Sequence, residues 1–369
     1  MDRAIPYYFP KSRFQALVDE LWRRGYTVLG PQLDQAAIVY GELQTVDQFP
    51  RGWKEEQEPG KYRLLPGDPD LWFQFAVGPH SWKRYFFPPF TTLVQIQPLK
   101  TGGWNFQAPS EPVPKYAMIG VRGCELAAMG IQDRVFADGP YQDSVYVQRR
   151  RQACLIAINC THPANTCFCP SMKTGPRCDS GFDLALTELQ DGFVCEIGTD
   201  LGEELLEHCE PEEATLRQIE DAEGRHQGAE QSITKRMNTN GLQQLLQANL
   251  DHPLWDTVAQ RCLSCTNCTM VCPTCFCSSV SELTDLQTGE IERQRTWDSC
   301  FNPDFSYMNG SDVRDDIRSR YRQWLTHKLS SWHDQFESSG CVGCGRCITW
   351  CPVGIDLTEE VATLQGGKA

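Results

Sequence analysis

Eight of the 19 cysteines stand in a repeated spacing that is typical of iron–sulfur cluster ligands. The spacing is C-x2-C-x2-C-x3-C followed by proline, and it occurs at Cys262, Cys265, Cys268 and Cys272 and again at Cys341, Cys344, Cys347 and Cys351. Three thiolates separated by two residues can bind three corners of one [4Fe–4S] cluster, whereas the fourth cysteine ligates the other cluster. The pattern therefore predicts two clusters with crossed ligands. The first is held by Cys262, Cys265, Cys268 and Cys351, and the second by Cys341, Cys344, Cys347 and Cys272.

Two other interpretations of these eight residues are open. Structural zinc also uses C-x2-C pairs, but it takes four ligands and would leave cysteines of each motif unused. The clusters could also serve only to hold the fold. Because paired clusters of this type usually pass electrons, the spacing favours electron transfer.

Four further cysteines predict a third iron–sulfur site. Cys124 and Cys160 follow the expected strands 116–121 and 153–158, and open α/β sheets place their ligands at the carboxyl ends of strands. Cys167 and Cys169 are two residues apart, so in extended chain their side chains face the same way. The alternative is that these are buried inert thiols, since cysteine packs like a small apolar side chain.

The remaining cysteines carry weaker signals. Cys275, Cys277 and Cys300 are interpreted as inert thiols, and Cys154, Cys178, Cys195 and Cys209 as ordinary core or surface thiols. His162 is expected to form hydrogen bonds beside Cys160 rather than to bind metal.

The elements that must position these residues fall into two kinds. Expected strands alternate with a helix at 125–136, which favours an α/β N-terminal domain with a parallel or mixed sheet. The chain is long enough for a second domain, and the C-terminal part is predicted to be a mostly α-helical dicluster ferredoxin-type domain. The predicted segments are 1–110 (α+β), 111–210 (α/β), 211–245 (helix and linker) and 246–369 (the two-cluster domain with a helical insert).

Other elements are expected from the apolar pattern. Residues 71–77 and 91–97 are predicted strands because β-branched and aromatic residues lie between glycine and proline. Residues 193–197, which end at Gly198, are predicted as a further strand of the α/β segment. An amphipathic helix is predicted from Asp312 to Phe336. Its cations are Arg314, Arg318, Arg320, Arg322 and Lys328. They form either an ordinary solvated face or a functional face that docks an acidic partner or tunes cluster potential.

Composition limits the function. The net charge of -14 argues against nonspecific binding to nucleic acid. No apolar run approaches the length of a membrane span, and the N-terminus lacks the pattern of a secretion signal. A cytoplasmic location is expected, where clustered cysteines usually bind metal. The sequence has no G-x-G-x-x-G, Walker or C-x-x-C-H motif, so flavin and nicotinamide are expected on a partner chain.

Several segments resemble one family. They are Gly120-Val121-Arg122-Gly123-Cys124-Glu125-Leu126, Asp133-Arg134-Val135-Phe136, Tyr146 with Arg149-Arg150, Asn159-Cys160, Thr166-Cys167-Phe168-Cys169-Pro170-Ser171-Met172, Gly181 to Glu188, Cys272 to Cys277, Trp297 to Cys300 and Cys341 to Pro352. Together they resemble the beta subunit of cytoplasmic NAD(P)-linked [NiFe] hydrogenases, the sulfhydrogenases. The electron-transfer subunit of anaerobic sulfite reductase is related. The chain has Glu125 where the family often has Asp, and Lys173 where it often has Gly.

The resemblance implies a relay without catalytic residues of its own. The implied partners are a flavin subunit that carries FAD and binds NAD(P), a small iron–sulfur hydrogenase subunit and a [NiFe] large subunit. Two alternatives remain: the electron-transfer subunit of anaerobic sulfite reductase, or an iron–sulfur subunit that carries no electrons.

Overall fold

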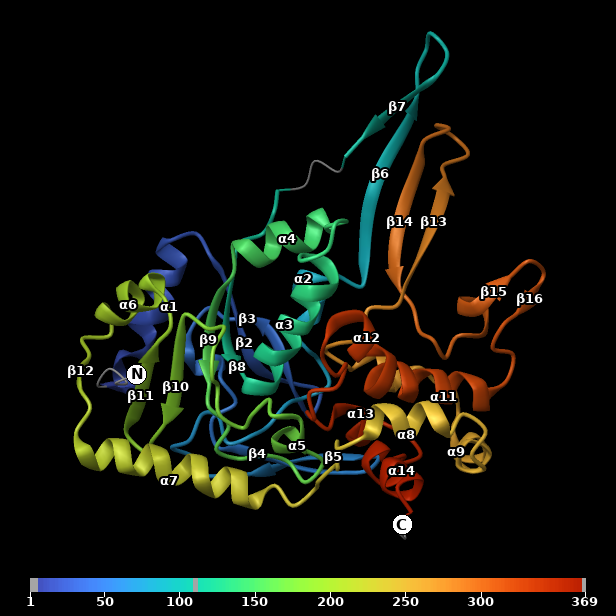
Figure 1. Ribbon diagram of the computed structural model, residues 1–369. Helices are drawn as coiled ribbons and strands as arrows, with labels where there is room; N and C mark the ends of the chain where they lie inside the picture. The colour runs from blue at the N-terminus through green and yellow to red at the C-terminus, as the bar shows by residue number, and fades with distance from the viewer. Residues whose placement is uncertain (1–5, 109–111, 367–369) are drawn as a thin grey trace.

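The computed structural model describes residues 6–108 and 112–366, and its N-terminal part is built on an eight-stranded mixed sheet (Figure 1). The strand order is β12-β1-β11-β10-β9-β8-β2-β3. The strands are β1 (Tyr7–Pro10), β2 (Thr27–Asp34), β3 (Ala37–Glu42), β8 (Tyr116–Val121), β9 (Cys154–Ile158), β10 (Leu184–Glu188), β11 (Gly192–Ile197) and β12 (Glu212–Glu213). The central strands β2, β8, β9 and β10 are parallel, and the outer pairs are antiparallel. The predicted α/β domain with a mixed sheet is confirmed.

The central strands are apolar on both faces because helices cover both sides. Successive side chains of a strand point to opposite faces. Ile119 and Ile156 accordingly lie in one core cluster with α1, while Met118 and Leu155 lie in a second cluster with α3 and α4. The helices of this part are α1 (Phe14–Arg23), α2 (Lys83–Phe86), α3 (Gly123–Phe136), α4 (Ser144–Arg151), α5 (Cys169–Met172), α6 (Asp200–Glu207) and α7 (Leu216–Ser232).

The C-terminal part is mostly helical and packs its own aromatic core. Trp255, Tyr321, Trp324 and Leu325 are buried there. Its helices are α8 (Leu242–Ala248), α9 (Leu254–Arg261), α10 (Asn267–Met270), α11 (Ile317–Thr326), α12 (Trp332–Phe336), α13 (Arg346–Thr349) and α14 (Leu357–Leu364), and a π-helical turn, His327–Ser331, joins α11 to α12. None of the helices in the described ranges is both long and apolar enough to cross a bilayer.

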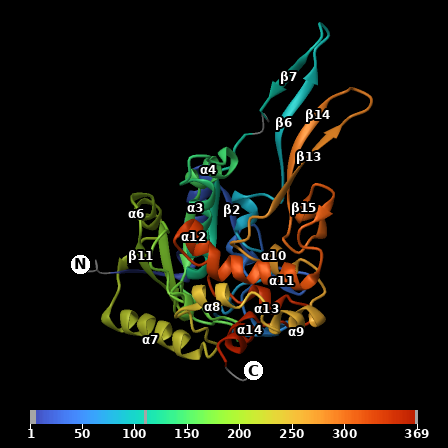
Figure 2. The same cartoon turned by 45° about the vertical axis from the view of Figure 1, so that its right-hand side comes forward.

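A four-stranded sheet projects from the body as an arm (Figures 1 and 2). Its order is β13-β14-β6-β7. The strands are β6 (Phe90–Pro98), β7 (Trp104–Gln107), β13 (Ser278–Thr284) and β14 (Ile291–Trp297). Residues far apart in the sequence thus share one sheet, and the insert between the two cysteine motifs contains a hairpin that the sequence analysis missed. Two small hairpins complete the fold: β4 (Trp53–Glu58) with β5 (Lys61–Pro66), and β15 (Tyr307–Met308) with β16 (Ser311–Asp312).

Two expected elements differ in the structure. The predicted strand at 71–77 is wrong, since these residues form no strand. Their apolar side chains are buried in the core, and the N–H groups of Trp72 and Phe73 donate to the Glu188 carboxylate at 2.7 and 2.9 Å. The expected helix at 312–336 starts later, at Ile317, and contains the π turn. The division of the chain into four segments stays a prediction.

Candidate iron–sulfur sites

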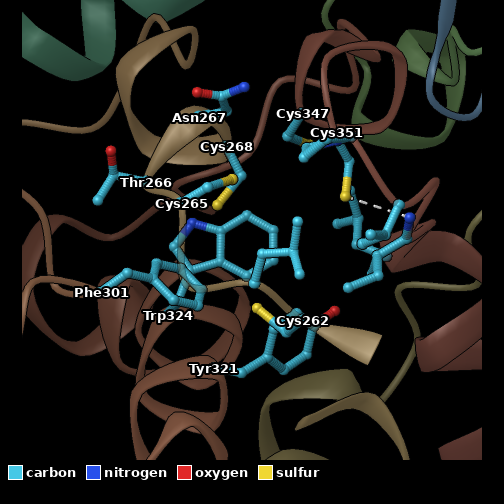
Figure 3. A pocket seen from close by; sticks show the side chains of 15 residues that line it. Cys262, Cys265, Thr266, Asn267, Cys268, Phe301, Tyr321, Trp324, Cys347 and Cys351 are labelled. Atoms are coloured by element: carbon cyan, nitrogen blue, oxygen red, sulfur yellow. Dashed lines mark hydrogen bonds between the residues drawn. The ribbon is translucent and has the colours of Figure 1, made fainter. Parts of the chain in front are cut away.

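The first cysteine motif and the end of the second line one pocket (Figure 3). Cys262, Cys265 and Cys268 follow the end of α9, and Cys351 reaches the same pocket from beyond α13. Cys347 also lines it. The crossed set predicted for the first cluster therefore comes together, although Cys351 is 83 residues beyond Cys268 in the sequence.

The local backbone explains how this loop presents its sulfurs. Ser264 and Thr266 adopt left-handed conformations, with φ of 53° and 68°, so the chain turns between successive cysteines. The Ser264 N–H donates to Cys262 Sγ at 3.4 Å, and the Ile355 N–H donates to Cys351 Sγ at 3.3 Å. Such donors favour thiolate ligands and tune cluster potential.

The second predicted set, Cys341, Cys344, Cys347 and Cys272, also lies together. Burial raises the pKa of Cys347 well above its ordinary value, with further contributions from the other three thiols. The Gly343 N–H donates to Cys341 Sγ at 3.5 Å. Because cluster ligands bind as thiolates, iron binding to these buried thiols would release protons.

Lys328 is buried against this second set. Its Nζ donates to Cys272 Sγ at 3.3 Å, to Thr274 Oγ1 at 3.1 Å and to the Gly340 carbonyl at 3.0 Å, and the side chain is only 3% exposed. Burial alone would lower the pKa of Lys328, but the neighbouring Cys272 thiolate raises it well above its ordinary value. A protonated amine therefore faces a predicted cluster ligand. Of the alternatives for the basic face, a solvated position is wrong for Lys328, because its side chain points inward from the π turn onto Cys272.

The four cysteines predicted for a third site line a separate small cavity. Cys124 lies in the first turn of α3, Cys160 follows β9, and Cys167 and Cys169 lead into α5. Cys344, from the second motif, lines the same cavity, and sequence reasoning did not find this.

His162 is not among the residues that line this cavity. It forms hydrogen-bond contacts with Thr161 at 2.9 Å and with Gln74 at 3.4 Å. Burial lowers the pKa of His162 to about 4. These contacts agree with the expected hydrogen-bonding role.

Glu125 and Arg346 connect the two halves of the site. The Arg346 guanidinium, fully buried in α13, forms an ion pair with Glu125 in the first turn of α3. Glu125 also accepts from Tyr40 at 2.9 Å and from Trp82 at 3.0 Å. Glu125 thus joins α3 to the second cysteine motif.

The other cysteines separate into two groups. Cys277 and Cys300 lie side by side, and a hydrogen bond from the Cys300 thiol lowers the pKa of Cys277 to about 7. Cys154, Cys195 and Cys209 are buried in the N-terminal core.

Among the described residues, no three His, Cys, Asp or Glu side chains are grouped tightly enough to hold a single metal ion. Each thiolate ligand of an iron–sulfur cluster binds a different iron atom. The thiols of the first predicted set converge on one pocket from two distant segments, as the crossed ligands of an iron–sulfur cluster do.

Comparison with known proteins gives the family. A family model described as a 4Fe-4S dicluster domain matches residues 261–355. Sulfhydrogenase 2 subunit beta of Pyrococcus furiosus is 31% identical over 291 residues, which cover 77% of this chain and 83% of that protein. This chain belongs to the sulfhydrogenase beta subunit family. The resemblance seen in the sequence is confirmed, and the chain is an iron–sulfur electron-transfer subunit. No solved structure matches it significantly.

The loop of the second cysteine motif packs tightly on the Cys167–Cys169 segment. Gly343 allows this close approach because it has no side chain. A Cβ at Gly343, where φ is 65°, would lie 2.7 Å from Cys169 Cα. We predict that Gly343→Ala lowers the free energy of unfolding by about 1 to 3 kcal/mol more than a strain-only control, because the packed backbone must shift. Gly241→Ala is that control, since Gly241 has the same φ of 65° and nothing within 4 Å of its Cβ position.

Denaturant unfolding of the anaerobically purified variants measures this difference. Equal losses of stability in the two variants would contradict the close approach.

Proposed function

We propose that this chain carries electrons between a [NiFe] hydrogenase module and a flavin subunit that binds NAD(P). The observation that carries the proposal is the pocket that joins Cys262, Cys265 and Cys268 to Cys351, with the second set beside it. The eight motif cysteines would hold two [4Fe–4S] clusters in the crossed arrangement. One-electron transfer is the chemistry that such clusters supply when bound.

The residues around the first set support a relay rather than a reaction site. Phe301, Tyr321 and Trp324, which are buried, line the pocket with the thiols and give it an apolar wall. Burial and nearby charge are the means by which a protein adjusts cluster potential. We propose no catalytic residue in this chain.

The arm supports an assignment to a larger complex. Several of its large apolar side chains are exposed: Trp104, Phe106, Val280, Leu283 and Leu286. They lie on the two outer strands of the arm, β7 and β13, and in the turn after β13. Large exposed apolar side chains mark many protein–protein interfaces. The relative in Pyrococcus furiosus is itself a subunit, as its name states. We propose that the partners are the flavin subunit, with FAD and NAD(P), the small iron–sulfur subunit and the [NiFe] subunit. We also propose a cytoplasmic location, where the 19 free cysteines stay reduced.

The test uses the purified complex with Cys262→Ala or Cys341→Ala in this chain. We expect hydrogen-driven reduction of NAD(P) to fall to the level measured without enzyme, because the path to the flavin is cut. Hydrogen-driven reduction of a viologen dye should persist, because the dye takes electrons directly from the hydrogenase module. Cys195→Ala, in the core strand β11, is the matched control and should change neither rate.

Three outcomes would contradict the proposal. Unchanged NAD(P) reduction in both motif variants would favour clusters that only hold the fold. An equal loss of both activities would place the chain elsewhere in the complex. A native complex that reduces sulfite and does not oxidise hydrogen would favour the sulfite reductase alternative.

A further inference from the structure

We propose that Cys124, Cys160, Cys167 and Cys169 hold a third iron–sulfur cluster at the carboxyl edge of the eight-stranded sheet, directly against the second cysteine loop. The proposed relay requires only the two motif clusters, so this inference goes beyond it. Inert core thiols are the competing interpretation, and the arrangement of the four side chains separates the two.

The four thiols come from three separate segments and meet at one cavity. Cys124 follows β8 and Cys160 follows β9, and these strands are parallel neighbours, so their carboxyl ends lie at the same edge. Cys167 and Cys169 approach from the loop that begins α5. All four side chains are at most 9% exposed. By contrast, the inert thiols Cys154, Cys195 and Cys209 are dispersed among large apolar side chains of the sheet core.

Arg122 gives an independent indication of an anionic ligand. It is 1% exposed and lines the same cavity. Its guanidinium donates to the carbonyls of Phe73 and Phe75 at 3.1 and 2.7 Å, and among the described residues its Nε has no hydrogen-bond partner. Its charge interacts with the buried Glu55 carboxylate, but within the described ranges no acceptor takes the Nε hydrogen. A buried donor without an acceptor is costly. A cluster bound by four thiolates carries net negative charge and would supply an acceptor for it.

The cavity adjoins the second cysteine loop. Cys344 lines this cavity and also lies beside Cys347 in the second predicted ligand set. The Phe168 N–H donates to the Gly343 carbonyl at 2.8 Å, and Thr174 Oγ1 donates to the Val342 carbonyl at 2.6 Å. A Cβ at Gly345 would lie 2.5 Å from the Thr166 carbonyl oxygen. The third site is therefore held in van der Waals contact with the loop of the second, and the line of redox sites would extend into the α/β domain.

Iron and acid-labile sulfide, measured on the anaerobically purified full-length chain, test the proposal without any activity assay. We expect about 12 iron atoms per chain in the wild type and about 8 in the Cys160→Ala/Cys167→Ala double variant. The Cys154→Ala/Cys195→Ala double variant is the matched control and should keep the wild-type content. About 8 iron atoms in the wild type, or about 12 in the Cys160→Ala/Cys167→Ala variant, would overturn the assignment.

A second variant guards against misfolding of the first. Cys160→Ser keeps a polar ligand atom of similar size, so the fold should persist. We expect the electron paramagnetic resonance spectrum of the reduced chain to lose or shift one cluster signal while the signals of the other two remain. A spectrum identical to that of the wild type would overturn the assignment. The signals of the two motif clusters are measured separately from that of the third. A result against the third cluster can therefore be distinguished from a result against the proposed electron relay.

Discussion

Replacing Cys262 and Cys351 together by Ala should remove one cluster, whereas replacing Cys272 and Cys351 together should remove two. The reason is the crossed arrangement, in which Cys351 joins Cys262, Cys265 and Cys268 around the pocket of Figure 3. If each motif instead bound its own cluster, Cys262 and Cys272 would be partners. The three double variants Cys262→Ala/Cys351→Ala, Cys272→Ala/Cys351→Ala and Cys262→Ala/Cys272→Ala therefore give different losses under the two arrangements.

The measurement is iron and labile sulfide per chain, with spin quantitation on the reduced protein. The crossed arrangement predicts a loss of about 4 iron atoms in the first variant and about 8 in the other two. Each variant replaces two motif cysteines by Ala. The three variants differ only in which pair is replaced, so they serve as controls for one another. A loss of about 4 iron atoms only in the Cys262→Ala/Cys272→Ala variant would contradict the crossed ligands.

Replacing Lys328 by Met should lower the reduction potential of the second cluster. A reduced cluster carries one more negative charge, and the buried ammonium beside Cys272 stabilises that state. A unit charge about 6 Å away contributes about 3 kcal/mol at an effective dielectric constant of about 20. That energy corresponds to a decrease of about 130 mV for a one-electron couple. Loss of the hydrogen bond to the sulfur acts in the same direction.

A redox titration followed by electron paramagnetic resonance measures this potential. Lys100→Met is the control, since Lys100 is exposed in the turn between β6 and β7 of the arm and the substitution removes the same charge. Its cluster potentials should match those of the wild type. An unchanged potential in Lys328→Met would contradict a role for this charge.

The predictable part of this protein rests on local spacing. Ligand spacing in the two cysteine motifs is a matter of a few residues, so the pattern alone predicted which thiols would gather, and Cys351 does line the pocket of the first motif. The strands β8 and β9 were also predictable, because continuous apolar runs followed by glycine or asparagine mark buried parallel strands. Two such strands end at the same edge, which placed Cys124 and Cys160 together.

Only the tertiary structure decided the contacts between distant segments. The strand β14 pairs with β6 across almost 200 residues, and the polar hairpin in which it lies has no apolar periodicity that marks a partner. The segment 71–77 is apolar because it fills the core, and composition alone cannot separate that from a strand. Lys328 is charged and lies in a helical pattern, so it resembles a solvated side chain until the π turn rotates it inward onto Cys272. Each of these depends on where another part of the chain lies, and a local pattern holds no information about that.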